Sequence, residues 1–466
     1  MINKREIRDP IHGFICRSDL EQLLIDTSVM QRLRGIRQLA LANLVYPGAL
    51  HTRFDHSLGV MHIAGKLAER LIHDQETQEL IRLAGLLHDI GHGPFSHVSE
   101  SILEKFNASG LAQIGKKDFH EQLTIDIIEK CPDIRRILGD PKLEKIINLL
   151  CGGGEGIEKG IISGSLDADK QDYLLRDSYF CGVKYGVFDS DRLIHTLQSW
   201  PDRYENLIAA SKDGVYAIEQ FVIAKYHMST QVYRHKIRLI TDAMIERALE
   251  LGIIEDKLQW LKDLFIYKGT NEYIQNFLKW DDARVTTALL YPLGTSGKAT
   301  ELFFRLKERH LFKVVFSKHL LEITDANVRS RLADLEKYPD IKLRIEQDLA
   351  EYLSKESEQT IAPHHVVVKQ FTIKSIREQS RNNEGSILII TDDGPRNFEE
   401  ISTLFKSIDE KQNDASIEVY APVTFSDLVI KRRKLAEFAQ SIHDKIVTIV
   451  TSEIQKEKGK GAADEC

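Results

Sequence analysis

Cysteine is scarce in this chain, and the few cysteines present are not spaced for disulfide bonding or zinc binding. They stand at Cys16, Cys131, Cys151, Cys181 and Cys466, with no CxxC pair. An odd number at wide spacing argues against a disulfide framework and favours a reducing compartment. The chain also lacks a run of about 18 apolar residues, and no apolar segment follows its first residues. We therefore expect a cytoplasmic protein that does not span a membrane.

Excess positive charge is missing as well. The formal net charge of −7 argues against a broad basic surface that binds nucleic acid through its phosphates. A local basic pocket for one small polyphosphate remains compatible with that charge. Since 466 residues exceed the size of one ordinary core, we expect more than one domain.

Apolar residues follow a helical period through most of residues 20–340. The pattern predicts helices at residues 57–72, 76–90, 121–130, 168–178, 217–251 and 299–308. Short β-rich runs appear later, at residues 366–368, 387–390 and 417–420. The sequence therefore predicts a mainly α fold, with a helical core over 1–340, a smaller α+β region over 341–455 and a disordered tail over 456–466.

Histidines and aspartates gather at the ends of the predicted helices. His56 opens one helix, His88 and Asp89 close the next, and Asp169 begins a third. Alone, the His88–Asp89 pair fits a helix C-terminus equally well. Two further histidines follow it within ten residues, however, and a core has little use for so many titratable rings. Two imidazoles and two carboxylates suit a first-row divalent ion, so we predict that these four residues form a metal site.

Four ordered sequence blocks resemble a known family. HTRFDHSLGV, LLHDIGHGPFSH, DFHEQ and LDADKQDYLLRDS are similar to the motifs of the HD-domain deoxynucleoside triphosphate (dNTP) triphosphohydrolases. The likeness covers roughly residues 5 to 250, and we expect the shorter type that lacks a SAM domain. It implies an HD-domain helical core that hydrolyses a dNTP to the deoxynucleoside and inorganic triphosphate.

The resemblance also implies how the reaction centre works. His56, His88, Asp89 and Asp169 would hold one divalent transition metal ion (iron, manganese, zinc, nickel or cobalt), and Mg²⁺ would accompany the triphosphate. Attack by water at the α-phosphorus needs a proton for the leaving 5′-oxygen, which a histidine can supply near neutral pH. The catalytic residues would be His97 as general acid, Glu100 and His120 as its support, and His92 beside the α-phosphate. Glu100 stands where the family usually has aspartate.

A substrate pocket follows from the same resemblance. Its residues would be Arg53, Lys170, Tyr173 and Lys225 for the phosphates, Gln38 and Asp177 for the 3′-hydroxyl, and Leu39 and Tyr233 beside the 2′ position. The family commonly has arginine at the position of Lys225, and lysine lacks the bidentate fork of arginine.

A second nucleotide site is implied near the N-terminus. Asp26 and Arg34 offer the donors and acceptors that read a guanine. The implied allosteric residues are Arg5, Asp26, Gln31, Arg34, His235 and Lys236, with dGTP or GTP as activator and a homotetramer (a dimer of dimers) as the product of assembly. In the alternative interpretation, Asp26 caps the following helix and Gln31 and Arg34 are ordinary helix-surface residues.

Two other functions remain open at this point. One is an HD-type nucleotidase or phosphodiesterase that acts on other nucleotides. The other is a non-catalytic HD protein that binds nucleotides or nucleic acid, although the negative net charge makes nucleic acid an unfavourable partner.

Overall fold

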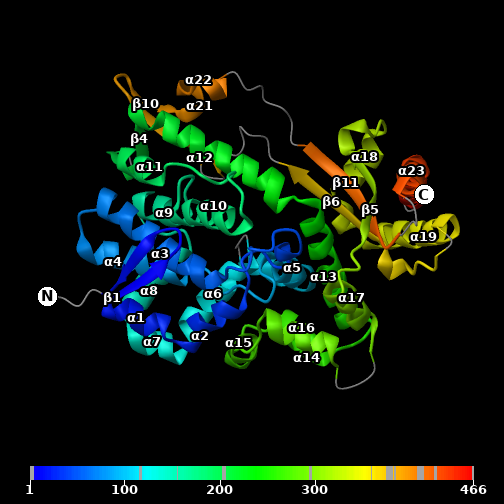
Figure 1. The fold of residues 1–466 in the computed structure, drawn as a ribbon, viewed down its shortest axis with the longest axis horizontal. Helices are drawn as coiled ribbons and strands as arrows, with labels where there is room; N and C mark the ends of the chain where they lie inside the picture. The colour runs from blue at the N-terminus through cyan, green and yellow to red at the C-terminus, as the bar shows by residue number, and fades with distance from the viewer. Residues whose placement is uncertain are drawn as a thin grey trace. The chain divides into compact units, whose positions relative to one another are not determined.

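The chain folds into two compact units, each built mostly from helices (Figure 1). The computed structural model describes residues 5–114, 118–154, 156–201, 206–292, 296–357, 359–373, 381–382, 385–406, 414–423 and 428–463. The first unit comprises Met1–Arg238, Leu249–Thr300 and Ile376–Glu410, and the second comprises Leu239–Ala248, Glu301–Ser375 and Lys411–Cys466. The mainly α prediction is confirmed. The division differs from a boundary at residue 340, because residues 301–340 belong to the second unit and residues 376–410 return to the first.

The first unit begins with a hairpin and two short helices. β1 (Arg5–Asp9) pairs antiparallel with β2 (Gly13–Arg17), and α1 (Asp19–Ile25) and α2 (Ser28–Arg32) follow. Ser18 and Glu21 form a capping box that satisfies backbone N–H groups at the start of α1. Thr27 caps α2, so the alternative that Asp26 caps this helix is wrong.

Three helices carry the predicted metal ligands. They are α3 (Arg53–Leu71), α4 (Gln75–Leu87) and α10 (Ala168–Cys181). α3 packs closely on α10 because Gly59 has no side chain: a Cβ there would lie 1.8 Å from Asp172 Oδ1. Gly85 likewise allows α4 to pack closely on α3, since a Cβ there would lie 3.2 Å from Ala64 Cβ. The ligand-bearing ends of these helices can therefore approach one another.

Further helices surround this core. They are α5 (His97–Ile114), α6 (Phe119–Lys130), α7 (Pro132–Leu138), α8 (Asp140–Leu150), α9 (Gly156–Ser163), α11 (Ser190–Thr196), α12 (Val215–His227), α14 (Gln259–Phe265), α15 (Asn271–Phe277) and α16 (Asp282–Leu290). The single helix predicted over 217–251 is wrong. α12 passes into a π-helical turn, η4 (Met228–Tyr233), and a new helix, α13 (Lys236–Ile254), starts after His235.

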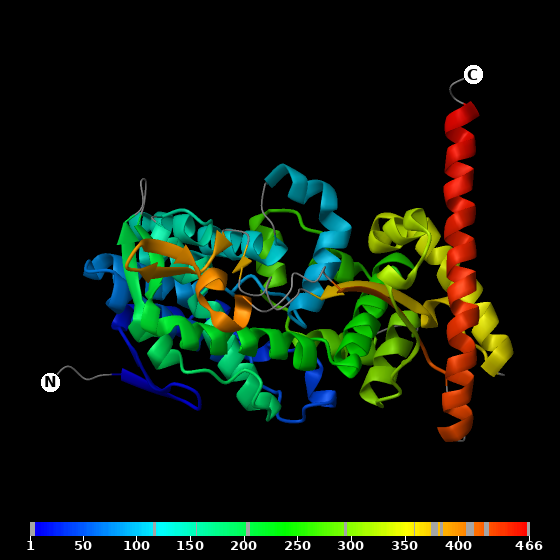
Figure 2. The same ribbon diagram turned by 90° about the horizontal axis from the view of Figure 1, so that it is seen from above.

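A four-stranded sheet completes the first unit, in the order β10-β9-β4-β3. In Figure 2 its late strands are the orange ones, which lie beside green segments from the middle of the chain. β3 (Leu197–Pro201) and β4 (Asn206–Ser211) are antiparallel, and β4 pairs in parallel with β9 (Leu388–Thr391). β10 (Gly394–Asn397) forms the edge, and β7 (Arg381–Asn382) pairs separately with β8 (Gly385–Ser386). The short helices α21 (Phe398–Ile401) and α22 (Thr403–Lys406) bury Phe398 and Phe405. This pairing draws the late segment 385–406 into the first unit.

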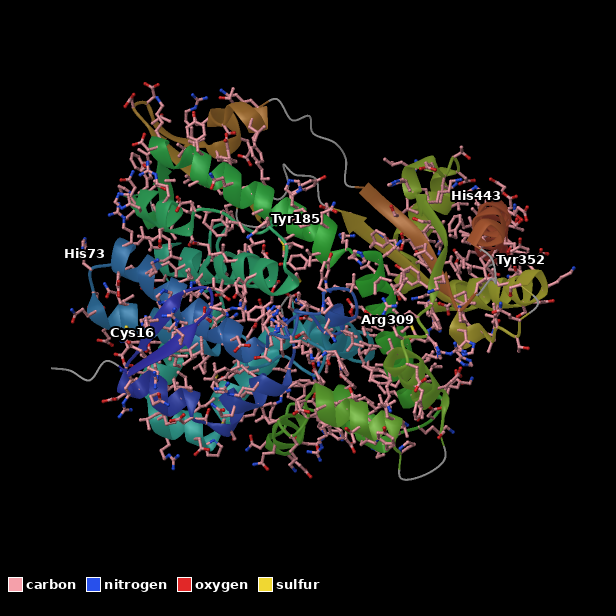
Figure 3. The ribbon with its side chains drawn as sticks, viewed as in Figure 1. Cys16, His73, Tyr185, Arg309, Tyr352 and His443 are labelled. Carbon is pink, nitrogen blue, oxygen red and sulfur yellow. The ribbon has the colours of Figure 1, made fainter. Side chains whose placement is uncertain are left out.

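The second unit combines a three-stranded antiparallel sheet with helices. The order is β5-β11-β6, formed by β5 (Lys313–His319), β11 (Asp414–Ala421) and β6 (Val367–Ile373). α17 (Lys298–Lys307) leads toward β5, and the helices of this unit include α18 (Ala326–Ala333), α19 (Pro339–Ser357) and α23 (Leu428–Ala463). Figure 3 labels Tyr352 on α19 and His443 on α23; the His443 ring stacks on Phe316 of β5.

The long last helix differs from the predicted disordered tail. α23 continues through residues 456–463, and residues 464–466 lie outside the described part. Ion pairs anchor its second half, since Arg331 binds Glu457 and Arg344 binds Glu453. Within the described residues, no helix is both long and apolar enough to cross a bilayer.

Candidate metal centre and substrate pocket

The four predicted metal ligands converge at one point of the first unit. His56 lies in the first turn of α3, His88 ends α4 and is followed by Asp89, and Asp169 is the second residue of α10. His56 Nε2 lies 2.9 Å from Asp169 Oδ1 and 3.7 Å from Asp89 Oδ2. His88 Nε2 lies 3.3 Å from Asp89 Oδ1 and 3.8 Å from Asp169 Oδ1. Three separated stretches of the chain thus bring two imidazoles and two carboxylates together.

The protonation pattern of both histidines fits a metal ion. His88 Nδ1 lies 2.8 Å from the Gly85 carbonyl, which only accepts, so Nδ1 carries the proton. Its buried Nε2 then presents a lone pair, and it has no hydrogen-bond partner in the described part of the chain. His56 Nδ1 likewise lies 2.8 Å from Asp172 Oδ2, so Nε2 faces the carboxylates. Burial opposes protonation, but Asp169 and Asp172 raise the pKa of His56 to about 10. A divalent ion satisfies the same negative field, in competition with that proton.

A fully buried carboxylate, Asp172, holds His56 in place. Besides His56, it accepts two hydrogen bonds from Arg176, from Nε at 2.8 Å and from Nη2 at 2.9 Å. His12 Nε2 lies 2.6 Å from its other side, and Arg176 Nη1 donates to Asp9 at 2.9 Å. Burial opposes ionisation, but Arg176 and the two histidines keep the pKa of Asp172 well below its usual range.

Sequence reasoning missed this support. Asp172 and Arg176 follow Asp169 at helical spacings of three and seven, which place them on one helix face. This helical spacing is the sequence feature that could have identified Asp172 and Arg176 as supporting residues. Support of this kind orients a metal-binding imidazole and raises its basicity.

The four predicted catalytic residues also meet. The rings of His92 and His120 stack with centroids 4.1 Å apart, and His97 meets His92 edge-on at 5.5 Å. Glu100 contacts the rings of His120 and His97. One carboxylate oxygen bonds His120 Nδ1, and the other lies 3.3 Å from His97 Nδ1. Burial opposes the effect, but Glu100 raises the pKa of His120, and the histidines lower the pKa of Glu100. His97 alone has a largely open side chain, 60% exposed, so it can reach a bound molecule.

The loop between His92 and His97 adopts a strained conformation. Phe95 and Ser96 have φ values of 64° and 54°, which non-glycine residues rarely adopt. Asp282 at the start of α16 compensates by accepting from Phe95 N at 2.7 Å and from Arg37 N at 3.0 Å. Burial raises the pKa of Asp282 to about 6. Arg53 Nε donates to Ser96 Oγ at 2.9 Å, so the loop is held from two sides.

A cavity of about 570 Å³ opens beside these groups. Its lining includes the predicted metal ligands His88, Asp89 and Asp169, the predicted catalytic residues His92, His97 and His120, and the predicted substrate residues Gln38, Leu39, Arg53, Lys170, Tyr173, Asp177 and Tyr233. The volume lies in the range that small-molecule sites occupy. Sequence reasoning missed Arg238, which lines the cavity and donates to the Tyr233 carbonyl at 2.7 Å.

Cationic groups lie at the metal end of this cavity. Arg53 Nη1 donates to Asp89 Oδ2 at 2.7 Å, and Lys170 pairs with Asp167, the cap of its own helix. Lys225, also predicted to bind the phosphates, lies in the last turn of α12 and is not one of the residues that line this cavity.

Three of the residues predicted to contact the sugar, Gln38, Asp177 and Tyr233, also line this cavity. Asp177 is held by His51 Nε2 at 2.7 Å and by the Tyr233 hydroxyl at 2.7 Å. The buried Gln38 Oε1 has no hydrogen-bond partner within the described ranges, so an acceptor is available to a bound hydroxyl. The π-helical turn η4 ends at Tyr233 and carries this ring to the cavity. His51, which stacks on Phe180 at 4.7 Å, was not predicted.

The predicted allosteric residues occupy three separate places. Asp26 accepts from Gln22 at 2.6 Å, and Arg34 Nε donates to Gln31 at 2.9 Å while its guanidinium lies 3.6 Å from the centroid of the Phe54 ring. Arg5 on β1 pairs with Asp19 at 3.3 Å. His235 caps α13, which starts at Lys236. Across the described residues, no hydrogen bond or ion pair joins these three groups.

Comparisons with known proteins give two family matches and several similar proteins. The family model of the HD domain matches residues 53–174 of this chain. The family model of the HD associated region matches residues 188–443. An uncharacterized protein of Methanocaldococcus jannaschii is 31% identical over 418 residues, or 89% of this chain and 79% of that protein. A deoxynucleoside triphosphate triphosphohydrolase SAMHD1 homolog of Dictyostelium discoideum is 30% identical over 66% of this chain and 59% of its own length.

A solved structure is also similar. The crystal structure of a hypothetical protein from Aquifex aeolicus superimposes with a TM-score of 0.65 at 32% identity. The superposition covers 93% of this chain and 99% of that one.

Proposed function

Because this chain belongs to the HD-domain superfamily of metal-dependent hydrolases, in the branch with an HD associated region, we propose that its substrate is a dNTP. The products would be the deoxynucleoside and inorganic triphosphate. The observation that carries this proposal is the convergence of His56, His88, Asp89 and Asp169 beside a cavity that is also lined by Arg53, Lys170, Gln38 and Asp177. The triphosphohydrolase named in Dictyostelium discoideum adds support.

The metal site and the side chains around it have different roles in the proposed reaction. His56, His88, Asp89 and Asp169 would hold a divalent ion of iron, manganese, zinc, nickel or cobalt, which would supply polarisation of a phosphoryl oxygen and a lowered pKa for a bound water. Arg53, Lys170 and Tyr173 hold the phosphate tail, whose remaining charge Mg²⁺ would offset, and we extend this role to Lys225. His92 lies beside the α-phosphate.

Proton transfer belongs to His97. Its open ring can protonate the leaving 5′-oxygen, while Glu100 takes the Nδ1 side and His120 holds Glu100. Attack at the α-phosphorus breaks the bond to the 5′-oxygen, so the triphosphate leaves in one piece. Gln38 and Asp177 bind the 3′-hydroxyl, and Leu39 and Tyr233 occupy the space that a 2′-hydroxyl needs.

Regulation by a second nucleotide forms part of the proposal. Asp26, Gln31 and Arg34 would read a guanine, Arg5 would bind its phosphates, and His235 and Lys236 would contact a neighbouring nucleotide. The activator would be dGTP or GTP, and its binding would drive assembly of a homotetramer.

Product analysis tests the proposed reaction. Metal-analysed protein is incubated with each dNTP, with and without GTP, and phosphorus products are separated by ion-exchange chromatography. We expect inorganic triphosphate and the deoxynucleoside, both absent with Asp169→Ala, whose side chain is 36% exposed and contributes little to the core. Orthophosphate, or turnover of monophosphates or cyclic nucleotides instead, would identify a different HD-type phosphohydrolase. Binding without turnover in every metal form would indicate a nucleotide-binding HD protein.

A further inference from the structure

A second group of metal-ligating side chains lies in the second unit. Glu301 comes from α17, and His364 and His365 come from the 3₁₀ turn η7 (Pro363–His365) that precedes β6. His364 Nε2 lies 3.3 Å from Glu301 Oε2, and His365 Nε2 lies 2.8 Å from Glu301 Oε1. One ligand atom from each residue lies within 4.8 Å of the others.

The arrangement of the two rings is unusual for neighbours in sequence. Successive side chains of a 3₁₀ turn diverge, yet the His364 and His365 centroids lie 4.1 Å apart and both Nε2 atoms face one carboxylate. Pro363 fixes the backbone at the start of this turn. The His365 side chain is 9% exposed and that of His364 is 12% exposed, so water screens neither ring well.

These distances suit coordination. Two ligand atoms about 2.0–2.2 Å from a tetrahedral zinc ion lie roughly 3.3 Å apart, which the His364–Glu301 separation already matches. His365 Nε2 lies 2.8 Å from the other carboxylate oxygen, Oε1, and one ligand atom from each of the three residues lies within 4.8 Å of the others. Burial lowers the pKa of His365, and His365 together with Arg305 lowers the pKa of Glu301 against the effect of burial.

The neighbouring arginine is compatible with this role. Arg305 Nε donates to Glu301 Oε1 at 3.1 Å, one turn along α17. Carboxylates that bind metals commonly accept such a bond on the oxygen that does not face the ion. Glu301 Oε2 would then face the ion together with the two imidazoles.

We propose that Glu301, His364 and His365 bind a divalent transition metal ion, best suited to zinc, with water completing the coordination. The site shares no residue with the HD centre and does not depend on the proposed substrate. It would tie α17 to the turn that leads into β6, so its occupancy would stabilise the second unit.

Metal counting on the full chain tests the site. The protein is stripped with chelator, reloaded with Zn²⁺ and desalted, and zinc per chain is measured by mass spectrometry. We expect two ions for the unaltered chain, one for Glu301→Gln and one for His364→Ala. Asp169→Ala should retain the ion held here. His310→Ala, which removes an exposed histidine just beyond α17, serves as the matched control and should keep both ions.

Cobalt gives an independent readout. Co²⁺ bound by imidazole and carboxylate absorbs in the visible range, so in the Asp169→Ala chain the remaining signal reports the second site alone. That signal should disappear when Glu301→Gln is added. Glu301→Gln keeps the shape of the side chain, and circular dichroism verifies that the variant is folded. Equal zinc content in the unaltered and Glu301→Gln chains, or a cobalt signal that survives the double change, would overturn the proposal and leave a hydrogen-bonded His–Glu cluster.

Discussion

At the scale of single residues, Asp172 offers the sharpest test of how the HD centre is organised. Asp172→Asn keeps the side-chain shape but weakens the bond that orients His56. We expect metal affinity to fall about 10–100-fold, as the loss of such supporting groups usually does. Chelator competition measures the affinity. Asp191→Asn, which removes an exposed carboxylate paired with Lys66, is the control and should leave the affinity unchanged.

His97 should behave differently from the ligands. His97→Ala removes the proposed proton donor, and we expect kcat to fall about 10²–10⁴-fold while metal content stays constant. Steady-state kinetics and metal analysis on the same preparation check both points. His73, an exposed histidine before α4 that Figure 3 labels, provides the control as His73→Ala. Loss of metal from His97→Ala would mean that His97 is a ligand instead.

Local motifs in the sequence identified residues that lie together in the fold. The blocks around His56, His88 and Asp169 carry their ligands in recognisable order, and the chain brings these residues together. Partners from distant segments were missed. His51 and Asp282 each contact a site element more than 100 residues away, and nothing near them in the sequence marks that contact.

At the scale of elements, the break between α12 and α13 explains how Tyr233 reaches the cavity. The apolar period runs through residues 217–251 without interruption, so the sequence predicts one helix. At the end of the π-helical turn, a tertiary bond joins the Tyr233 hydroxyl to Asp177, and a local bond joins Arg238 to the Tyr233 carbonyl. Wide turns of this kind are frequent at functional sites.

The turn leads to a prediction about sugar selectivity. Tyr233→Ala opens the space beside the 2′ position, so the preference for dNTP over NTP in kcat/KM should fall about 10-fold or more. Tyr233→Phe is the matched control, because it keeps the ring and loses only the bond to Asp177. Competition between dGTP and GTP as substrates gives the ratio directly. An unchanged ratio in the alanine variant would remove Tyr233 from sugar selection.

The loop between His92 and His97 should impose a pH dependence on stability through Asp282. Its pKa is raised from 3.8 to about 6 in the folded chain, so the folded state binds this proton more tightly than the unfolded state. Stability from this group is therefore greatest below about pH 4 and declines by about 3 kcal/mol as the pH rises past 6.

Asp282→Asn should abolish this component. Urea unfolding at several pH values between 4 and 7 gives the free energy of unfolding as a function of pH. The difference between the slopes of the two chains gives the contribution of Asp282. Asp133→Asn, at a half-exposed carboxyl on α7, controls for the loss of one acidic group. Parallel slopes in the Asp282→Asn and unaltered chains would contradict the raised pKa.

At the scale of the whole molecule, the order of segments along the chain does not follow the division into units. The shift from helical to β-rich composition placed a boundary near residue 340, but β5 pairs with β11, about 100 residues later. β9 instead joins β4 of the first unit. Such pairings are non-local, and their partners cannot be chosen from strand propensity alone. The sequence therefore indicates the kinds of element better than the unit to which each belongs.

Assembly is the property of the whole molecule that the proposed regulation makes testable. If a guanine nucleotide binds at Asp26 and Arg34 between subunits, GTP or dGTP should shift the mass toward a tetramer, because a ligand that binds only the assembled form favours it. Light scattering coupled to size-exclusion chromatography measures the mass with and without nucleotide. Asp26→Ala should abolish the shift without loss of stability, since the side chain is exposed and, among the described residues, its one side-chain hydrogen bond is to Gln22. Asp140→Ala, another exposed carboxylate, should behave as the unaltered chain does. A mass that never responds to nucleotide, or a response that survives Asp26→Ala, would remove this segment from regulation and leave the catalytic proposal untouched.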